Sequence, residues 1–309
     1  MARVCTGPDV SASVALVRGG ALGDYVLTLP LIRALRAAVP EARLILVGDP
    51  ATTRLAGDAE RIDPDDRHWS QLYTSAGAPQ TLRERFSDCR LLVACVAGGS
   101  DAAPPGYLEN LSALCPRLLV GDPLPTPGQQ RHMSARLLDP LREAGFSLPD
   151  DSVPRIELPQ SAPGEELVIL HPGSGSRDKC WPAERFVSLL AWLEGQGQRV
   201  GILWGPVEEA RRFEFPQALA ATSKRLCPES PLDLAGHLAA ARLYVGNDSG
   251  PGHVAAAVGC PTLSLFGPTD PRLWRPLGPR AHVLRAPCGQ LEDLATTAVI
   301  QSVAEVLAE

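Results

Sequence analysis

Short aliphatic runs alternate with amphipathic stretches along the whole chain, and this alternation constrains the fold more than any other feature. In the first half, the pattern predicts strands at 13–18, 42–49 and 89–98 and helices at 25–39 and 129–145. In the second half, it predicts strands that run into glycine-rich turns within 165–176, 241–253 and 261–270, a further strand at 198–206, and a helix at 182–197. Strands that alternate with helices are typical of parallel sheets covered by helices.

The two series of strands and helices predict two domains, which suits a chain of 309 residues. The intervening segment 148–166 contains four prolines, a composition typical of a linker. We therefore expect an α/β protein with two doubly wound, Rossmann-like domains, 1–160 and 161–309, which face each other across a cleft. In such sheets, ligands bind beyond the carboxyl ends of the strands.

Composition and charge exclude several classes of protein. Hydrophobic residues make up 45% and charged residues 21% of the chain, so a disordered protein is excluded. Both halves are slightly acidic, with 16 Arg against 18 acidic residues in 1–155, and this argues against a nucleic-acid partner. No apolar run approaches the roughly 18 residues of a membrane span, and the first 20 residues do not form a secretory signal. We therefore expect a cytoplasmic protein.

The eight cysteines are scattered along the chain. They form no Cys-x-x-Cys pair and no cluster with histidine at zinc-ligand spacing. Reduced thiols and no metal site are therefore expected. The acidic run 63–66 contains a proline and is predicted to be an exposed turn.

The first glycine-rich turn, RGGALGDYVLTLP (18–30), does not fit a dinucleotide-binding fingerprint. Its glycines, at 19, 20 and 23, miss the Gly-x-Gly-x-x-Gly spacing, and Asp49 comes 30 residues after Gly19 where about 20 is usual. An NAD-dependent oxidoreductase is therefore only an alternative. Asp24 stands at the start of the predicted helix, where an N-cap or a functional carboxylate are both possible.

The second turn, HPGSGSRDKCWP (171–182), places glycines and then a cation between a strand and a helix. Backbone N–H groups in such a loop bind phosphate, and Lys179 adds charge. Only 2 of the 29 basic residues are lysines, so a lysine here indicates that a compact ammonium is required. His171 is either a buried turn histidine or a ligand contact.

The third turn, GNDSGPGHVAAAVG (246–259), precedes another helix. Asp248 or Ser249 is suited to cap that helix, whereas Gly250 and Gly252 would let a ligand approach the backbone at its positive end. Two more turns of this kind, WGPVEE and FGPTDP, follow other strands. So many glycine-rich strand ends indicate a binding site.

In their order and spacing, these motifs resemble glycosyltransferase family 9, the ADP-heptose:lipopolysaccharide heptosyltransferases. The matching motifs are GALGDYVLTLP, HPGS followed by K-x-W-P, WGPVEE, NDSGPGH and FGPTDP. The resemblance extends from about residue 14 to the C-terminal tail, while residues 50–160 match only in pattern. It implies a GT-B fold whose first domain binds mainly the acceptor and whose second binds the nucleotide-sugar.

The resemblance also implies roles for individual residues. Asp24 corresponds to the catalytic base, Lys179 to the phosphate contact that stabilises the leaving group, and Glu208 to the ribose-binding acid. Leu27 stands where some members carry histidine. The implied donor-binding residues are His171, Gly173, Ser174, Lys179, Glu208, Asp248, Ser249, Gly250 and His253, and the implied acceptor-binding residues are Gly20, Gly23 and Asp24.

The expected activity is inverting transfer of a heptose, or a similar sugar, from an ADP-activated donor to a lipopolysaccharide core or related glycan. No cofactor or metal is expected, because Lys179 and the helix N-termini after Ser176 and Asp248 supply positive charge for the diphosphate. The protein would work in the cytoplasm, including the cytoplasmic face of the inner membrane. A catalytically silent sugar-nucleotide-binding protein of the same fold is the second alternative, and it predicts no transfer with the correct donor.

Overall fold

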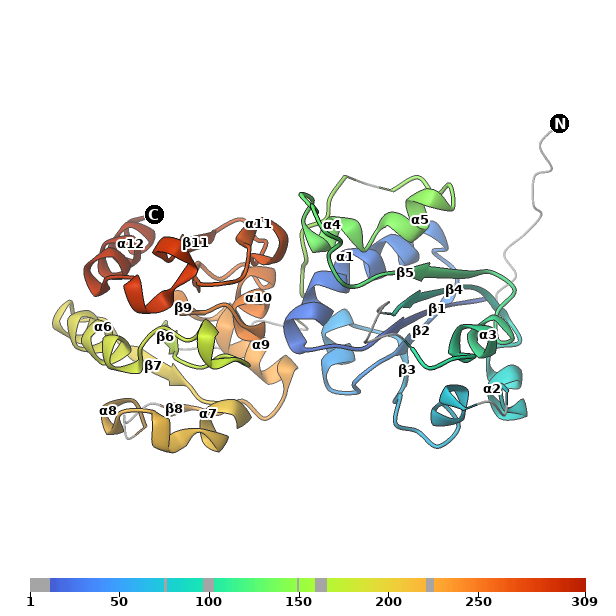
Figure 1. Ribbon diagram of the computed structural model, residues 1–309, viewed down its shortest axis with the longest axis horizontal. Helices are drawn as coiled ribbons and strands as arrows, with labels where there is room; N and C mark the ends of the chain where they lie inside the picture. Colours follow the sequence, from blue (N-terminus) through green and yellow to red (C-terminus); the bar gives the residue numbers. More distant parts are fainter. Residues whose placement is uncertain (1–11, 75–76, 97–102, 149, 159–165, 221–224) are drawn as a thin grey trace. The chain divides into compact units, whose positions relative to one another are not determined.

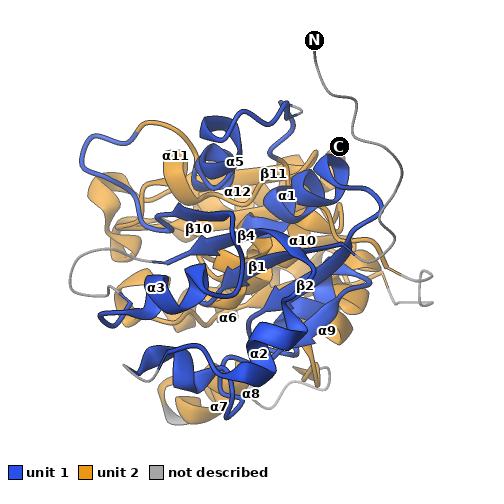
Figure 2. Cartoon of the chain, turned by 90° about the vertical axis from the view of Figure 1, so that its right-hand side faces the viewer, with its two compact units in different colours: residues 1–20, 28–129, 133–152 blue, residues 21–27, 130–132, 153–309 orange. Residues whose placement is uncertain are grey.

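The computed structural model describes residues 12–74, 77–96, 103–148, 150–158, 166–220 and 225–309. The chain divides into two compact units, coloured separately in Figure 2. The first unit comprises residues up to 20, 28–129 and 133–152, and the second comprises 21–27, 130–132 and 153–309. The boundary predicted at residue 160 lies outside the described residues.

The first unit contains a five-stranded parallel sheet with the strand order β3-β2-β1-β4-β5 (Figure 1). Its strands are β1 (Ser13–Arg18), β2 (Arg43–Val47), β3 (Glu60–Ile62), β4 (Cys89–Cys95) and β5 (Leu118–Gly121). Its helices are α1 (Leu22–Ala38), whose first turn counts with the second unit, α2 (Gln80–Arg85), α3 (Tyr107–Ser112), α4 (Met133–Arg136) and α5 (Asp139–Glu143), with 3₁₀ turns η1 (Thr52–Ala56) and η2 (Ser70–Tyr73).

All six residues of β1 are buried, as expected for a central strand covered on both faces. Ala15 and Val17 belong to a core cluster with Trp69 and Phe86, whereas Val14 and Leu16 point to the opposite face. The acidic run 63–66 forms the exposed turn that the sequence predicted.

The second unit contains a six-stranded parallel sheet with the order β11-β10-β9-β6-β7-β8. Its strands are β6 (Val168–His171), β7 (Val200–Leu203), β8 (Arg225–Leu226), β9 (Leu243–Asn247), β10 (Thr262–Phe266) and β11 (Ala281–Arg285). Its helices are α6 (Ala183–Gly195), α7 (Pro206–Ala210), α8 (Gln217–Ala220), α9 (Pro231–Ala239), α10 (Gly250–Ala257), α11 (Pro271–Trp274) and α12 (Thr296–Ala308), with 3₁₀ turns η4 (Arg177–Lys179), η5 (Arg212–Glu214), η6 (Pro287–Gly289) and η7 (Leu291–Asp293).

Helices α6 and α12 share the main core of the second unit with the sheet. Phe186 and Leu189 of α6 and Val303 of α12 are fully buried in one cluster with Leu170 and Val245 of the central strands. Both sheets have the strand order of Rossmann-like folds. The two doubly wound α/β domains predicted from the sequence are therefore confirmed.

The single helix predicted over 129–145 is wrong. The segment forms two short helices, α4 and α5, and residues 129–132 are not helical. Pro140 has no N–H to donate to the carbonyl of Arg136, and its ring crowds that carbonyl, so one continuous helix is disfavoured.

Candidate functional site

Two adjacent strands of the second sheet end in polar side chains. β6 ends at His171 and β9 ends at Asn247, and His171 pairs in register with Gly246. The strand order of the sheet reverses between these two strands, since β7 lies beyond β6 and β10 lies beyond β9. Ligand sites of doubly wound sheets form at this point, so the fold predicts a ligand site beyond the ends of β6 and β9.

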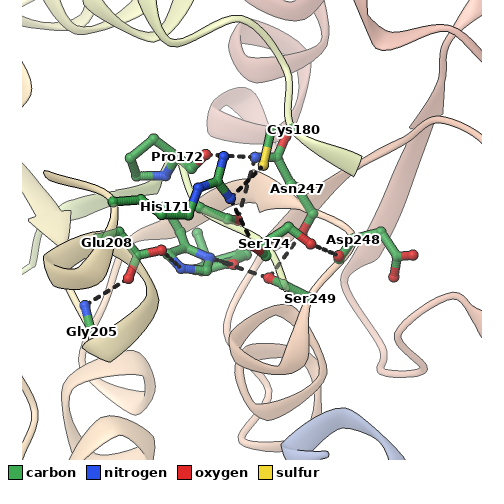
Figure 3. Close-up of polar contacts among 12 residues, drawn as sticks. His171, Pro172, Ser174, Cys180, Gly205, Glu208, Asn247, Asp248 and Ser249 are labelled. Carbon is green, nitrogen blue, oxygen red and sulfur yellow. Dashed lines mark hydrogen bonds and ion pairs between the residues drawn. The ribbon is translucent and has the colours of Figure 1, made fainter. Parts of the chain in front are cut away.

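Asn247 joins the loop after β6 to the end of β9. Its Nδ2 donates to the carbonyls of Pro172 at 2.8 Å (Figure 3) and Gly173 at 3.4 Å. Its Oδ1 accepts from the N–H of Trp181 at 2.9 Å. The side chain is completely buried. Sequence reasoning missed this residue, although a polar residue at the end of the apolar run LYVGN was an available signal.

His171 lies at the centre of a buried polar network. Its Nδ1 lies 3.0 Å from Tyr244 Oη and 3.2 Å from Ser249 Oγ, and its Nε2 lies 3.1 Å from Glu208 Oε1 (Figure 3). Glu208 Oε2 accepts from the N–H of Gly205 at 2.7 Å. Burial favours a raised pKa for Glu208, but the bonds from His171 and Gly205 outweigh it and hold this pKa below its usual value.

Gly173 has to be glycine because of this network. A Cβ at this position would lie 1.5 Å from Glu208 Oε1, so a side chain here would displace the carboxylate. The loop therefore passes directly over Glu208.

A cavity of about 430 Å³ opens beside these strand ends, and all of its lining residues belong to the second unit. It contains two carboxylates, an ammonium and an imidazole, from Asp24, Asp248, Lys179 and His253. The full lining is Ala21, Gly23, Asp24, Leu27, Ser174, Gly175, Ser176, Lys179, Asp248, Ser249, Gly250, His253, Thr269 and Trp274.

Lys179 and Asp248 form an ion pair inside this cavity. Lys179 Nζ lies 3.1 Å from Asp248 Oδ2, and their side chains are 35% and 8% exposed. Ser174 Oγ donates to the backbone carbonyl of Asp248 at 2.9 Å, which fixes the loop after β6 against the turn after β9.

Asp24 is at the third position of α1 and is not an N-cap. Its Oδ2 accepts from the N–H of Ala21 at 3.1 Å, so the carboxylate reaches back over the first turn as in one half of a capping box. Asp24 thus supports its helix and lines the cavity at the same time.

Two glycines allow the first turn of α1 to approach the first turn of α10. A Cβ on Gly250 would lie 2.9 Å from Leu22 Cβ, and a Cβ on Gly23 would lie 3.0 Å from His253 Cδ2. Both glycines were singled out from the sequence, and this close approach explains why larger residues are excluded at both positions.

Two other expectations about helix starts are wrong. The helix expected after Ser176 is a single 3₁₀ turn of three residues, too short for an appreciable dipole. Ser249 is at the N-cap position of α10, but its hydroxyl bonds the carbonyl of Asn247 and His171 instead of capping the helix. Among the expected helix ends, α10 thus remains as a source of positive potential.

His253 is buried on the first turn of α10. Its Nδ1 has no hydrogen-bond partner among the described residues, and the side chain is 6% exposed. Burial lowers its pKa to about 4, an effect that the carboxylates of Asp248 and Asp24 oppose. The imidazole is therefore neutral near pH 7.

Arg211 supports the loop that carries Lys179, and sequence reasoning missed it. Its Nη1 donates to the carbonyl of Ser174 at 3.4 Å and lies 3.9 Å from Cys180 Sγ. Its Nε donates to Glu214 at 2.9 Å, and the side chain is 20% exposed. One guanidinium thus contacts both ends of the loop 174–180.

Most of the predicted site residues line the cavity, and four do not. The lining includes Gly23, Asp24, Ser174, Lys179, Asp248, Ser249, Gly250 and His253. His171, Gly173 and Glu208 lie behind it in the buried network, and Gly20 is exposed with a φ of 106°, which glycine readily adopts. In the part of the chain that the structure describes, no three His, Cys, Asp or Glu side chains gather as a metal site. No helix within the described ranges is long and apolar enough to cross a membrane.

The sequence matches the profile of glycosyltransferase family 9 (heptosyltransferase) over residues 142–304, just over half of the chain. Among its curated relatives, lipopolysaccharide heptosyltransferase 1 of Escherichia coli K12 is 28% identical over 327 residues, which cover 95% of this chain and 99% of the relative. Lipopolysaccharide heptosyltransferase 1 of Pseudomonas aeruginosa is 37% identical over 145 residues, 46% of this chain and 39% of the relative.

Solved structures show the same fold. The structure of E. coli heptosyltransferase WaaC with ADP superposes with a TM-score of 0.71 at 22% identity, covering 95% of this chain and 99% of that one. The E. coli ADP-heptose lps heptosyltransferase II gives a TM-score of 0.75 at 19% identity, covering 96% and 98%. These likenesses confirm the predicted GT-B fold class.

Proposed function

The chain belongs to glycosyltransferase family 9, the heptosyltransferases, and we propose that it transfers a heptose from ADP-heptose to a sugar of the lipopolysaccharide core. The observation that carries this proposal is the cavity that holds a carboxylate on α1, an ammonium on η4 and a second carboxylate after β9. Full-length likeness to lipopolysaccharide heptosyltransferase 1 supports the substrate pair.

In the proposed reaction, Asp24 accepts the proton of the acceptor hydroxyl as that oxygen attacks the anomeric carbon of the donor. The bond from this carbon to the diphosphate breaks on the opposite face, so the configuration inverts. ADP leaves with an additional negative charge. Lys179 and the N-terminus of α10 stabilise that charge, because fixed dipoles and cations act most strongly where charge develops.

The remaining predicted residues have supporting roles in the proposal. Glu208 lies outside the lining of the cavity described above, and in this proposal it binds the ribose hydroxyls with the lone pairs that its bonds to His171 and Gly205 leave free. His171 and Gly173 hold Glu208 in place, and Ser174 and Ser249 frame the donor. Gly250 and His253 contact the sugar together with Asp248.

Gly20 and Gly23 complete the acceptor side beside Asp24. We further propose that the lipid-linked acceptor brings the protein to the cytoplasmic face of the inner membrane. The domain division near residue 160 remains part of this proposal, with the nucleotide-sugar bound by the C-terminal domain.

A donor screen tests the proposed function. ADP-heptose and UDP- and GDP-sugars are incubated with the protein and truncated core acceptors, and release of nucleoside diphosphate is measured. ADP-heptose with a core acceptor is expected to give turnover, and the rate is expected to be unchanged in excess EDTA. Turnover with a different donor alone would refute the substrate assignment, and restoration of lost activity by magnesium would refute metal independence.

A further inference from the structure

The cavity carries more negative than positive charge before any ligand enters. Among the described residues that line it, Asp24 and Asp248 are acidic and Lys179 is the basic one, while burial keeps His253 neutral near pH 7. Lys179 is already paired with Asp248 at 3.1 Å. A nucleoside diphosphate that binds Lys179 would therefore have to compete with the carboxylate of Asp248.

Asp248 is held in this position from both sides. Its N–H donates to the carbonyl of Leu265 at 3.0 Å, and its own carbonyl accepts from Ser174 Oγ at 2.9 Å. The backbone thus cannot carry the carboxylate away without breaking bonds to two neighbouring segments. Asp248 is therefore held beside Lys179.

We propose that Asp248 discriminates the sugar donor from the spent nucleotide by competing with the diphosphate for Lys179. A carboxylate only accepts hydrogen bonds, so the hydroxyls of a bound sugar can replace the ammonium as its donors. A nucleoside diphosphate without a sugar offers no such donors, and it faces the repulsion of a like charge. The inference rests on the proposed function and adds a residue that favours release of ADP over release of the donor.

The test measures the affinity of the full chain for ADP and for ADP-heptose by calorimetry, in the wild type and in Asp248→Asn. The amide keeps the shape of the side chain and removes its charge. ADP is expected to bind about 3- to 20-fold more tightly to the variant, because Lys179 no longer has to give up a carboxylate partner in a partly exposed ion pair when the diphosphate binds. ADP-heptose is expected to gain less, so the preference for donor over ADP falls. If Asp248→Asn is thermally unstable, Asp248→Ser is measured in its place, and the same changes in affinity are expected.

Two controls isolate the competition. Asp233→Asn removes a carboxylate of α9 that lies 3.6 Å from His237 and outside the lining of the cavity, and it should leave ADP affinity unchanged. In a Lys179→Ala background, Asp248→Asn should strengthen ADP binding much less, because the contested ammonium is absent.

ADP binding that is no tighter in Asp248→Asn would overturn the inference, and so would an equal gain with and without Lys179. If the wild type transfers heptose and the variants give either of these results, only the inference fails. If the wild type neither transfers heptose nor binds ADP, the proposed function fails, and the inference fails with it.

Discussion

The two sheets have the same strand order around their central pair, but their strand ends differ chemically. In the second sheet, His171 and Asn247 end β6 and β9 and bind each other's loops through several buried hydrogen bonds. In the first sheet, β1 ends at the buried Arg18, whose Nε donates to Thr28 Oγ1 at 3.2 Å, and β4 ends at Cys95, whose pKa burial raises to about 11.

This difference shows that sheet topology alone does not create a ligand-binding site. Both sheets direct strand ends toward a switch point, but in the second sheet buried side chains fix the loops before any ligand is present. Variants that change one sheet end and leave the other intact therefore test which end performs the chemistry.

The largest effect is expected from Asp24→Asn. The amide oxygen still accepts from the N–H of Ala21, but it cannot take up the acceptor proton, so kcat should fall by about 10²–10⁴. Affinity for ADP should change little. Single-turnover transfer and ADP titration measure the two quantities. Asp49→Asn is the matched control, because Asp49 follows β2 as Asp24 follows β1 of the same sheet and also accepts a backbone N–H, that of Thr52 at 2.7 Å, but does not line the cavity. Near-native transfer by Asp24→Asn would show that Asp24 only supports its helix.

The next effect is expected from Lys179→Ala. A charge-assisted contact to the diphosphate contributes about 1.5–3 kcal/mol, so ADP affinity should weaken roughly 10- to 150-fold. The kcat should fall as well, since the diphosphate gains charge as it leaves. Arg177→Ala, which removes a 77% exposed cation two residues away, is the control for net charge. Equal losses in both variants would mean that Lys179 makes no specific contact.

A pH effect is expected from the second unit. The pKa of His253 is about 6.5 in the unfolded chain and about 4 in the folded protein. As pH falls below 6.5, the unfolded chain therefore gains a proton that the folded protein does not bind. The free energy of unfolding is thus fully retained above pH 6.5 and decreases as pH falls toward 4. The free energy of unfolding should fall by about 1–3 kcal/mol between pH 6.5 and 4.5. Urea denaturation of the wild type and His253→Gln measures it. An equally steep decline in the variant would assign the loss to other groups, among them His132, whose pKa burial also lowers to about 4.

The smallest effect is expected from Arg211→Ala. Loss of the guanidinium frees both ends of the loop 174–180, so KM for the donor should rise about 3- to 10-fold with a smaller change in kcat, as a loss of about 1 kcal/mol implies. Arg212→Ala, which removes a 56% exposed partner of Glu209, should leave KM unchanged. Steady-state kinetics with partial rescue by Arg211→Lys would support positioning of Lys179. A fall in kcat with no change in KM would contradict a role of Arg211 in positioning Lys179.

Local sequence patterns determined much of this protein. Continuous apolar runs predicted β1, β4, β6 and β9 correctly. A strand that is buried on both faces consists almost entirely of apolar residues, so it is visible in the sequence alone. β3 and β8 are only three and two residues long, too short for a pattern to identify them. The glycine-rich turns were also visible, since positions of close backbone approach tolerate no side chain.

The tertiary structure alone decided which of these turns meet. Lys179 and Asp248 are 69 residues apart in the sequence, and Gly23 lies against α10 from the start of the chain. Arg211 and Asn247 likewise gain their roles from contacts with a loop formed elsewhere in the sequence. Periodicity records which face of an element is buried, but it does not record the partner that buries it, because hydrophobic burial is not directional.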